Sequence, residues 1–251
     1  MFDKTMLLDG DIFLYMVTTQ LEEVIDWGDD MFTLHSDFKQ CRDKLADTIT
    51  FYQNILLCKN IAIALTHPKN FRKQISPEYK FNRKHLRKPV AYQALKSWLK
   101  ENYKCFEKPY LEGDDCLGIL ATSDIIKGDK VIVSKDKDLK TIPAQHYVMN
   151  CKGENLEINE QEADYWHMHQ TLTGDVSDNY KGCPQVGAKT AAKILDGLKT
   201  SKDMWQAVLA QYKKQNLSEK EALLQARLAR ICRASDYNFE RQRPILWTPN
   251  I

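Results

Sequence analysis

The chain has 251 residues, of which 43% are hydrophobic and 28% charged, and its formal net charge at pH 7 is +2. These values are ordinary for a soluble globular protein with one full core and room for a smaller appendage. They exclude a membrane helix, because no stretch approaches the roughly 20 apolar residues that a span needs. Seven scattered cysteines without a Cys-x-x-Cys motif favour free thiols over a zinc knuckle or a redox pair, so we expect a cytoplasmic protein.

Strands and helices alternate over the first part of the chain. Apolar runs predict buried strands at Thr5–Leu8, Asn60–Thr66 and Lys130–Ser134. Helical spacing predicts helices over Ser36–Cys58 and Glu112–Ile126. This alternation is typical of an α/β domain with a mostly parallel central sheet flanked by helices, in which the carboxyl ends of the strands form the binding crevice.

Acidic side chains cluster at the ends of these elements. The four clusters contain Asp9 and Asp11; Glu112, Asp114 and Asp115; Asp136 and Asp138; and Asp175 and Asp178. Because Asp9 and Asp136 each follow an apolar run, a parallel sheet would bring them to the same edge. Gathered carboxylates repel one another unless a cation or a proton compensates, and hard oxygen ligands suit Mg²⁺ or Mn²⁺ rather than zinc.

A basic stretch with interleaved aromatic residues follows the second strand, at residues 68–110. Its cations include Arg72, Lys73, Lys80, Arg83 and Lys84, and its aromatic residues include Tyr79, Phe81 and Tyr92. Cations suit phosphates and rings suit bases, so this composition favours nucleic-acid binding over the alternative of a solvated surface loop.

The chain from Asn159 onward has helical spacing, with helix-length patterns at Glu160–Leu172 and Ser218–Ala234. Between them, a turn containing glycine and proline at 182–187 opens directly into an apolar-periodic helix. Glycines let backbone amides approach a phosphate, and a helix N-terminus attracts one. Lys189 and Lys193, one helical turn apart, could then hold the same backbone; the alternative is an ordinary capped helix–turn–helix in the core.

Taken in this order, these features resemble the 5′-nuclease family, whose members include phage 5′→3′ exonucleases, flap endonucleases and the 5′-nuclease domain of bacterial DNA polymerase I. The likeness is greatest to the exonucleases of short-tailed phages. It rests on the segments KFNRK at 80–84, LEGDD at 111–115, KDKDLKTIP at 135–143, GDVSDNY at 174–180 and ARI at 229–231. No single segment is specific, but their combination spans nearly the whole chain.

The resemblance implies a PIN-like nuclease core at residues 1–158, including a basic helical arch at 68–110, and a helical DNA-binding region at 159–251. A helix–three-turn–helix is expected at about 175–197. Two Mg²⁺ or Mn²⁺ ions are implied, together with K⁺ at the helical hairpin. The carboxylates that match the family's metal site are Asp9, Glu112, Asp114, Asp115, Asp136, Asp138, Asp175 and Asp178.

The same resemblance implies roles for the cations. Lys80 and Arg83 match basic arch residues near the scissile phosphate, and Asp136 is expected between the two ions, so these three are the candidate catalytic residues. Tyr79 matches an aromatic residue that contacts a terminal base. The remaining residues expected to bind DNA are Arg72, Lys73, Lys84, Gly182, Val186, Gly187, Lys189, Thr190 and Lys193.

Two positions depart from the family pattern. Where the family usually has Asp after the second strand, this chain has Leu65-Thr66-His67, and we expect Asp11 to compensate in part for the missing carboxylate. Gln185 stands where the hairpin often has glycine.

The implied activity is that of a divalent-metal-dependent 5′→3′ exodeoxyribonuclease with flap endonuclease and RNase H-type activity, used in phage DNA replication, primer removal and host DNA degradation. Its expected partners are duplex DNA with 5′ ends, nicks or flaps, and RNA:DNA hybrids; we expect a monomer with no membrane association. Two alternatives stay open, a PIN-type ribonuclease acting on single-stranded RNA and a non-catalytic binder of DNA junctions.

Overall fold

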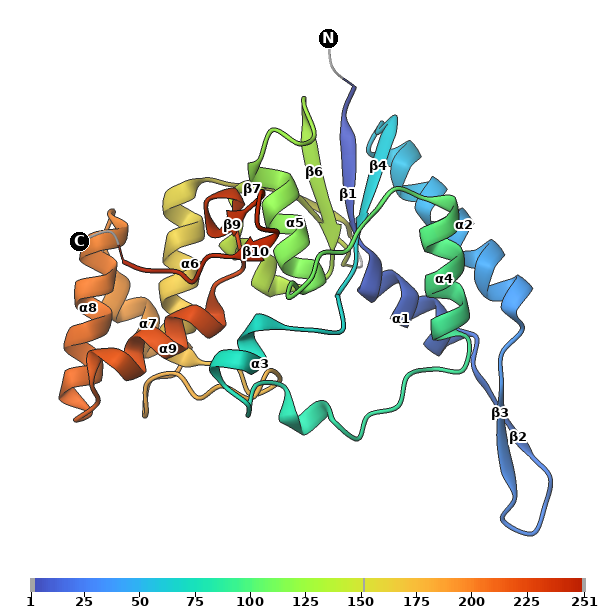
Figure 1. Cartoon of the computed structure of the whole chain (residues 1–251), viewed down its shortest axis with the longest axis horizontal. Helices are drawn as coiled ribbons and strands as arrows, with labels where there is room; N and C mark the ends of the chain where they lie inside the picture. Colours follow the sequence, from blue (N-terminus) through green and yellow to red (C-terminus); the bar gives the residue numbers. More distant parts are fainter. Residues whose placement is uncertain (1–2, 151, 250–251) are drawn as a thin grey trace.

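A six-stranded sheet forms the centre of the computed structural model, which describes residues 3–150 and 152–249. The strand order is β5-β4-β1-β6-β7-β8, and every neighbouring pair is parallel except β7 and β8 (Figure 1). The strands are β1 (Thr5–Asp9), β4 (Asn60–Ala64), β5 (Cys105–Phe106), β6 (Lys130–Ser134), β7 (Ala144–Val148) and β8 (Glu154–Ile158). The predicted fold class is therefore confirmed, and three of the sheet's strands, β5, β7 and β8, were not predicted.

The register of the parallel strands brings their carboxyl ends to one edge. Asp9 at the end of β1 lies beside Ala64 of β4, and Leu8 lies beside Val133 of β6. Asp136 follows β6 by two residues and therefore reaches the same edge as Asp9. This confirms the expectation that the two acids share one crevice.

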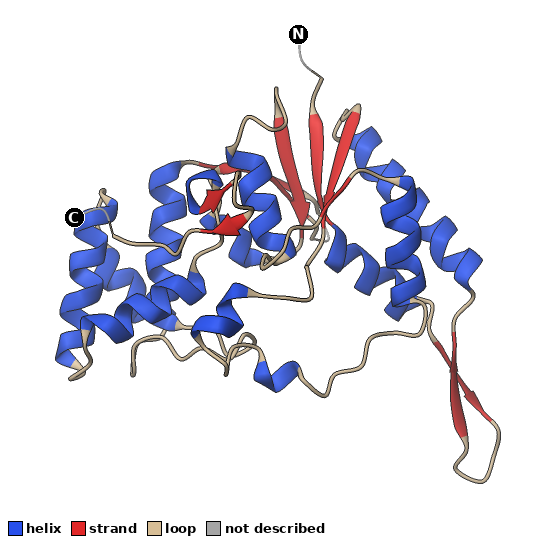
Figure 2. Cartoon of the chain, viewed as in Figure 1, coloured by secondary structure: helices blue, strands red, loops and turns tan. Residues whose placement is uncertain are grey.

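Helices cover both faces of the sheet (Figure 2). One face packs on α1 (Gly10–Gln20), α2 (Phe38–Ile55) and α4 (Tyr92–Asn102), and the other on α5 (Gly113–Thr122). Side chains alternate along β1, since Met6 and Leu8 enter the first core whereas Leu7 enters the second. Both faces being buried explains why the strands read as continuous apolar runs.

The segment between β4 and α4 crosses the molecule as a separate span (Figure 1). It contains the short helix α3 (Phe71–Ile75) and the 3-10 turn η1 (Phe81–Arg83). The prediction of an arch over 68–110 was too long, because Leu95 and Leu99 of α4 are fully buried against α1 and α2. We call the remaining span, residues 67–91, the arch.

The C-terminal part is helical, as predicted. Met168, Trp205 and Ala226 belong to its own core, and the chain leaves the helix at Arg230 rather than at Ala234. Its elements are α6 (Glu160–Thr173), α7 (Ala188–Leu195), α8 (Ser201–Lys214), α9 (Glu219–Ala229), η3 (Ala234–Asp236), β9 (Tyr237–Asn238) and β10 (Arg243–Pro244). The 3-10 helix η2 (Lys137–Thr141) packs on α6.

A two-stranded hairpin, β2 (Glu23–Asp26) and β3 (Phe32–His35), projects from the body beyond α1 and was not predicted. In the described ranges, no helix combines the length and the apolar character needed to cross a membrane. The six cysteines that lie in those ranges are free; Cys151 lies outside the described residues.

Candidate active site

The carboxyl edge of the sheet opens into a cavity of about 380 Å³ whose walls are mainly acidic. Lys80, Arg83 and Lys88 of the arch face the same space. Its carboxylates are Asp9, Asp11, Glu112, Asp114, Asp136, Asp138 and Asp178. We call this space the acid cavity; it gathers six of the eight carboxylates predicted for a metal site.

Hydrogen bonds at the ends of the strands fix the orientation of two of these acids. Asp9 caps α1 by accepting a hydrogen bond from the Ile12 N–H (3.2 Å), and it accepts another from the Ser134 hydroxyl (2.7 Å). The same Ser134 oxygen accepts from the Asp136 N–H (3.0 Å), and the Asp136 carboxylate accepts from the Asp138 N–H (2.8 Å). The sequence therefore holds these carboxylates in place through local caps, with Ser134 as a link that sequence reasoning missed although it directly precedes Lys135-Asp136.

Asp115 does not join the acid cavity, and this corrects the prediction that it binds metal. Its side chain is fully buried and receives two hydrogen bonds from Arg72 (2.7 and 2.8 Å) and one each from the N–H groups of Glu112 and Cys232 (both 3.0 Å). Successive residues of a helix point about 100° apart, so Asp114 faces the cavity while Asp115 faces Arg72.

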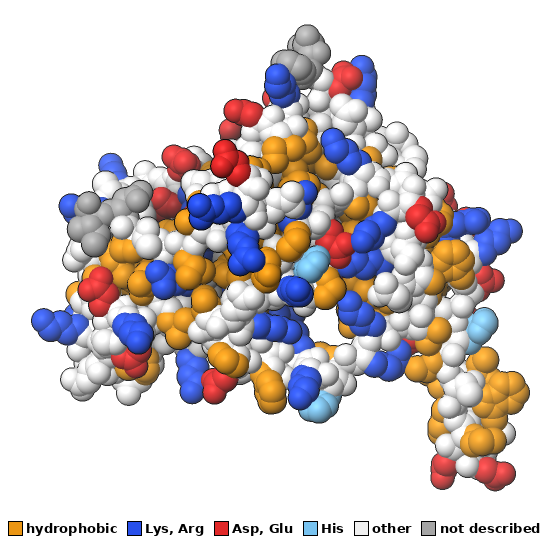
Figure 3. Space-filling model, viewed as in Figure 1, with side chains coloured by type: hydrophobic (Ala, Val, Ile, Leu, Met, Phe, Trp, Pro, Cys, Tyr) orange, Lys and Arg blue, Asp and Glu red, His pale blue; other side chains and the backbone are white. Residues whose placement is uncertain are grey.

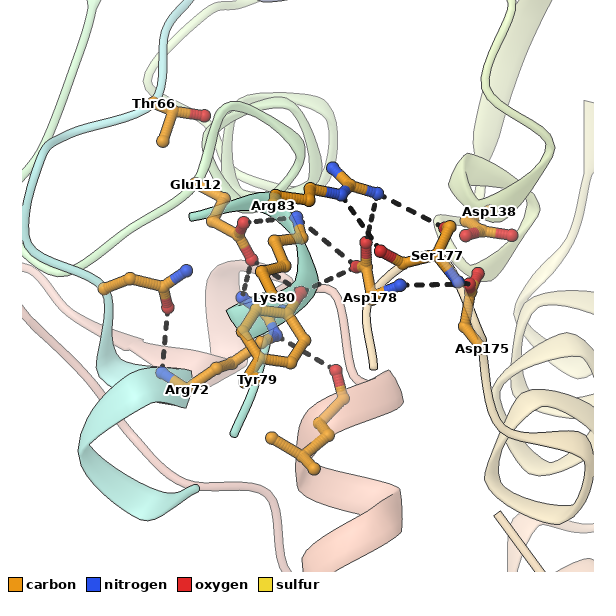
Figure 4. Close-up of polar contacts among 12 residues, drawn as sticks. Thr66, Arg72, Tyr79, Lys80, Arg83, Glu112, Asp138, Asp175, Ser177 and Asp178 are labelled. Carbon is orange, nitrogen blue, oxygen red and sulfur yellow. Dashed lines mark hydrogen bonds and ion pairs between the residues drawn. The ribbon is translucent and has the colours of Figure 1, made fainter. Parts of the chain in front are cut away.

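Arg72 is correspondingly not a DNA contact, which corrects a second prediction. Its side chain is buried and also donates to Glu112 (3.0 Å; Figure 4). It further donates to the carbonyls of Leu228 (3.0 Å) and Arg230. These contacts tie the base of the arch to α5 and to the end of α9. A guanidinium with this many partners is suited to such a buried position.

The arch reaches the acids through Tyr79, Lys80 and Arg83, which surround Asp178 and Glu112 in Figure 4. Lys80 Nζ lies 2.5 Å from Glu112 and 3.3 Å from Asp178, and Arg83 lies 2.6 Å from Asp178. Lys80 precedes the 3-10 helix η1 and Arg83 is its last residue, and the backbone of Lys80 lies in the left-handed region (φ 56°). Such backbone strain in a non-glycine residue is typical of functional sites.

Tyr79 is placed differently from the prediction. Its ring is buried and its hydroxyl lies within hydrogen-bonding distance of Glu112 (2.9 Å) and Asp178 (2.8 Å). Its ring also stacks beside that of Tyr180, 6.4 Å away between centroids. A ring held in this way is not exposed for stacking on a terminal base; it supports the two carboxylates instead.

The crowding of negative charge perturbs the acids of the cavity. Burial, reinforced by Asp11 and Asp136, raises the pKa of Asp9 to about 7. Burial, with Asp136 and Asp175 nearby, likewise raises the pKa of Asp138 to about 7. Burial opposes a low pKa for Glu112 as well, but Lys80 and Arg72 lower it to about 2. The acids of the cavity therefore divide into Glu112 and Asp178, which are paired with cations, and others such as Asp9 and Asp138 that have no cation partner within ion-pair distance.

Asp175 lies at the margin of this arrangement. It borders a neighbouring cavity together with Asp138 rather than the acid cavity itself, and it accepts a hydrogen bond from the Ser177 N–H (2.6 Å). Throughout residues 3–150 and 152–249, no three acidic, histidine or cysteine side chains are drawn together as a compact metal-ligand set. The acids instead surround an open space, and a bound cation would have to draw their carboxylates closer together.

The two departures from the family pattern have structural counterparts. Asp11 accepts hydrogen bonds from the Thr66 N–H (2.7 Å) and the Tyr92 hydroxyl (2.8 Å), so it supplies a carboxylate beside the residue that follows β4. His67 lies outside the acid cavity and borders a separate cavity on the other side of Lys80. Partial compensation by Asp11 stays a prediction.

The segment predicted as a helix–three-turn–helix, about 175–197, contains turns up to Gly187 and the helix α7, and the helix that precedes it, α6, ends before this segment at Thr173. Gln185 adopts a left-handed backbone (φ 62°), which explains why glycine would suit that position. The side chain of Val186 is buried in the C-terminal core, and Gly182 packs closely against Gly174, so these two shape the hairpin rather than its surface. The exposed members of the predicted set are Gly187, Lys189, Thr190 and Lys193.

An acid-lined cavity at the carboxyl edge of a parallel sheet, capped by the cations of an arch, places the protein in the class of 5′-nucleases. The family model described as the 5′-3′ exonuclease, N-terminal resolvase-like domain, matches residues 4–169. The chain is 31% identical over 284 residues to the exonuclease of Escherichia phage T7, and 30% identical over 283 residues to the exodeoxyribonuclease of Enterobacteria phage T3. Each alignment covers 98% of this chain and 94% of the relative.

The fold is similar to that of the flap endonuclease of bacteriophage T5, solved as a pseudo-enzyme-product complex with DNA and metal ions. The TM-score is 0.67 at 16% identity, with 90% of this chain and 88% of that chain covered. The chain therefore belongs to the 5′-3′ exonuclease family and is a hydrolytic nuclease of the exonuclease and flap endonuclease type.

Proposed function

We propose that this protein is a divalent-metal-dependent 5′→3′ exodeoxyribonuclease that acts on duplex DNA at 5′ ends, nicks and flaps, and that it also removes RNA from RNA:DNA hybrids. The observation that carries the proposal is the convergence of acids from four distant parts of the chain on one cavity beneath the Lys80–Arg83 turn. A relative that covers the whole chain is named an exodeoxyribonuclease, which supports DNA as the substrate.

The donors of the acid cavity suit two Mg²⁺ or Mn²⁺ ions. All are carboxylate oxygens, which hard divalent cations prefer. Burial, and then the neighbouring carboxylates, raise the pKa values of Asp9 and Asp138, and bound cations would favour the charged form of both groups. When bound, such a pair activates water and stabilises the departing oxygen of a phosphodiester. The residues proposed to hold the ions are Asp9, Glu112, Asp114, Asp136, Asp138 and Asp178, with Asp11 and Asp175 behind them.

The arch supplies the groups that contact the scissile phosphate. Lys80 is held between Glu112 and Asp178, and these carboxylates raise its pKa against the effect of burial, so it keeps its positive charge at neutral pH. A phosphate entering the cavity would receive hydrogen bonds from Lys80 and Arg83 as negative charge develops on its oxygens. Both residues are therefore proposed to be catalytic, together with Asp136.

The duplex is proposed to lie across the N-terminal end of α7. Lys189 is exposed in the first turn of α7 beside Thr190 and the N-cap Gly187, and Lys193 is exposed one turn further along, in the last turn. Backbone N–H groups at a helix start and nearby lysines suit a phosphate chain, and K⁺ could join them at the hairpin. Lys73 and Lys84 extend the cationic surface along the arch.

The test is cleavage of 5′-labelled substrates with and without Mg²⁺. We expect Mg²⁺-dependent shortening of duplex DNA from its 5′ end, cutting of a 5′ flap, and degradation of the RNA strand of a hybrid. Cleavage of single-stranded RNA alone would favour a PIN-type ribonuclease. Tight binding to DNA junctions without any cleavage would favour a non-catalytic binder, which Asp11 argues against because it restores a carboxylate near Thr66.

A further inference from the structure

A second cavity, of about 540 Å³, adjoins the acid cavity beneath the arch. The two spaces share Lys80, Lys88 and Glu112 in their walls, so they adjoin each other at the Lys80 side chain. Figure 3 shows Lys and Arg side chains, with histidine among them, around a hollow between the arch and the body of the molecule. We call this second space the lysine cavity.

The sign of the charge changes from one cavity to the other. The acid cavity has seven carboxylates facing three cations. The lysine cavity has five lysines, Lys73, Lys80, Lys88, Lys96 and Lys100, facing three carboxylates. A free phosphate group would therefore be repelled on one side of Lys80, unless metal ions compensate, and attracted on the other.

Helix α4 holds its two lysines at the wall of this cavity. Lys96 donates to the Thr66 carbonyl (2.9 Å) and to Glu107 (2.8 Å), and Lys100 donates to the other oxygen of Glu107 (2.5 Å). One carboxylate thus orients two ammonium groups and neutralises only one of the two charges. Lys88 stands over the Tyr92 ring, 4.1 Å from its centroid, close to these like charges.

His67 adds a directed donor. Its Nδ1 accepts a hydrogen bond from the Lys69 N–H (3.1 Å), which leaves the proton of the neutral ring on Nε2. His67 also borders the lysine cavity. This residue stands where a further metal-binding acid was expected, and its ring offers a hydrogen-bond donor rather than a carboxylate.

We propose that the lysine cavity binds the 5′-terminal phosphate monoester of the strand being shortened, and that the enzyme therefore discriminates between phosphorylated and unphosphorylated 5′ ends. The inference rests on the proposed function, because the scissile phosphate must lie in the acid cavity for the strand end to reach beyond Lys80. A monoester carries more negative charge than a backbone diester and has three free oxygens. Lys100, Lys96 and His67 would receive that group.

The test compares one duplex with a 5′-phosphate and the same duplex with a 5′-hydroxyl. We expect wild-type protein to bind the phosphorylated end about tenfold more tightly, the factor that one charged hydrogen bond supplies, and to cleave it faster in single-turnover assays. Lys100→Gln and His67→Gln should bring both ratios toward one, with unchanged unfolding midpoints. Lys213→Gln, on the exposed side of α8, is the matched control and should keep the ratios.

Equal affinity and equal rates for the two ends in the wild-type protein would overturn the proposal, as would ratios that neither variant alters. Affinities measured in EDTA separate this inference from the activity. If neither duplex is cleaved with Mg²⁺, the proposed function fails, while a preference for the phosphorylated end in EDTA that Lys100→Gln removes would still support the lysine cavity.

Discussion

Arg72 gives the most direct test of how the arch is joined to the core. Its side chain is 3% exposed, and Arg72→Ala would leave the fully buried Asp115 with only the N–H groups of Glu112 and Cys232 as partners. Removing one partner of a buried ion pair costs about 3–5 kcal/mol, because the remaining charge is uncompensated. At about 2–4 °C per kcal/mol for a chain of this size, the melting temperature should fall by roughly 6–20 °C.

Equilibrium unfolding in urea, with Lys73→Ala as the control, measures this effect. Lys73 is the exposed neighbour of Arg72, so its replacement should change the free energy of unfolding by no more than about 0.5 kcal/mol. An Arg72→Ala protein that is as stable as wild type but binds DNA more weakly, with a flatter salt dependence, would refute the reasoning. That result would support the original prediction that Arg72 contacts a DNA phosphate.

Four further outcomes follow from the site. Asp136→Asn should abolish cleavage while DNA affinity and the unfolding midpoint persist; a variant that loses its fold would contradict the catalytic assignment. Lys80→Ala should slow single-turnover cleavage by a factor on the order of 10²–10³, so unchanged rates would show that Lys80 is misassigned. Lys189→Ala should weaken duplex binding and reduce the slope of log affinity against log salt by about one, and an unaltered slope would argue against a phosphate contact. Burial raises the pKa of Asp9 and Asp138 from 3.8 to about 7, so between these pH values the folded protein retains protons that the unfolded chain has released. Without metal, the free energy of unfolding should therefore fall from about pH 4 to pH 7. Mg²⁺ should raise the melting temperature more at about pH 8 than at about pH 5, and a rise that does not depend on pH would contradict binding of Mg²⁺ to these carboxylates.

The parallel part of the fold could be predicted because its strands are buried on both faces. Lys130–Ser134 was predicted with the observed limits, because the β-branched run Val131–Val133 between polar segments is typical of a strand that is buried on both faces. Strands β7 and β8 were missed because Ala144–Val148 and Glu154–Ile158 are largely half-exposed or exposed and mix polar with apolar residues, without a continuous apolar run or a regular alternation. The hairpin at residues 23–35 was missed for a similar reason, since its strands are largely exposed.

The candidate site could be predicted only as a set of acids, not as individual roles. Asp114 and Asp115 are adjacent residues of the same type, so the sequence does not show which of them faces the cavity. Their different roles depend on Arg72, which pairs with Asp115 and lies 43 residues from it along the chain. Tyr79 resembles a base-stacking residue until its hydroxyl is seen between Glu112 and Asp178. Partners that are distant along the chain decide which polar residues are structural, and the local spacing of residues does not predict those partners.

The central claim is that the acid cavity holds divalent ions. Crystals soaked in Mn²⁺ and measured near the manganese absorption edge test it most directly. We predict anomalous density between the arch and the sheet edge, within coordination distance of Glu112, Asp114, Asp136, Asp138 and Asp178, and its loss in crystals of Asp136→Asn. Anomalous density that appears only elsewhere, or none while the soaked protein still cleaves DNA, would contradict the account.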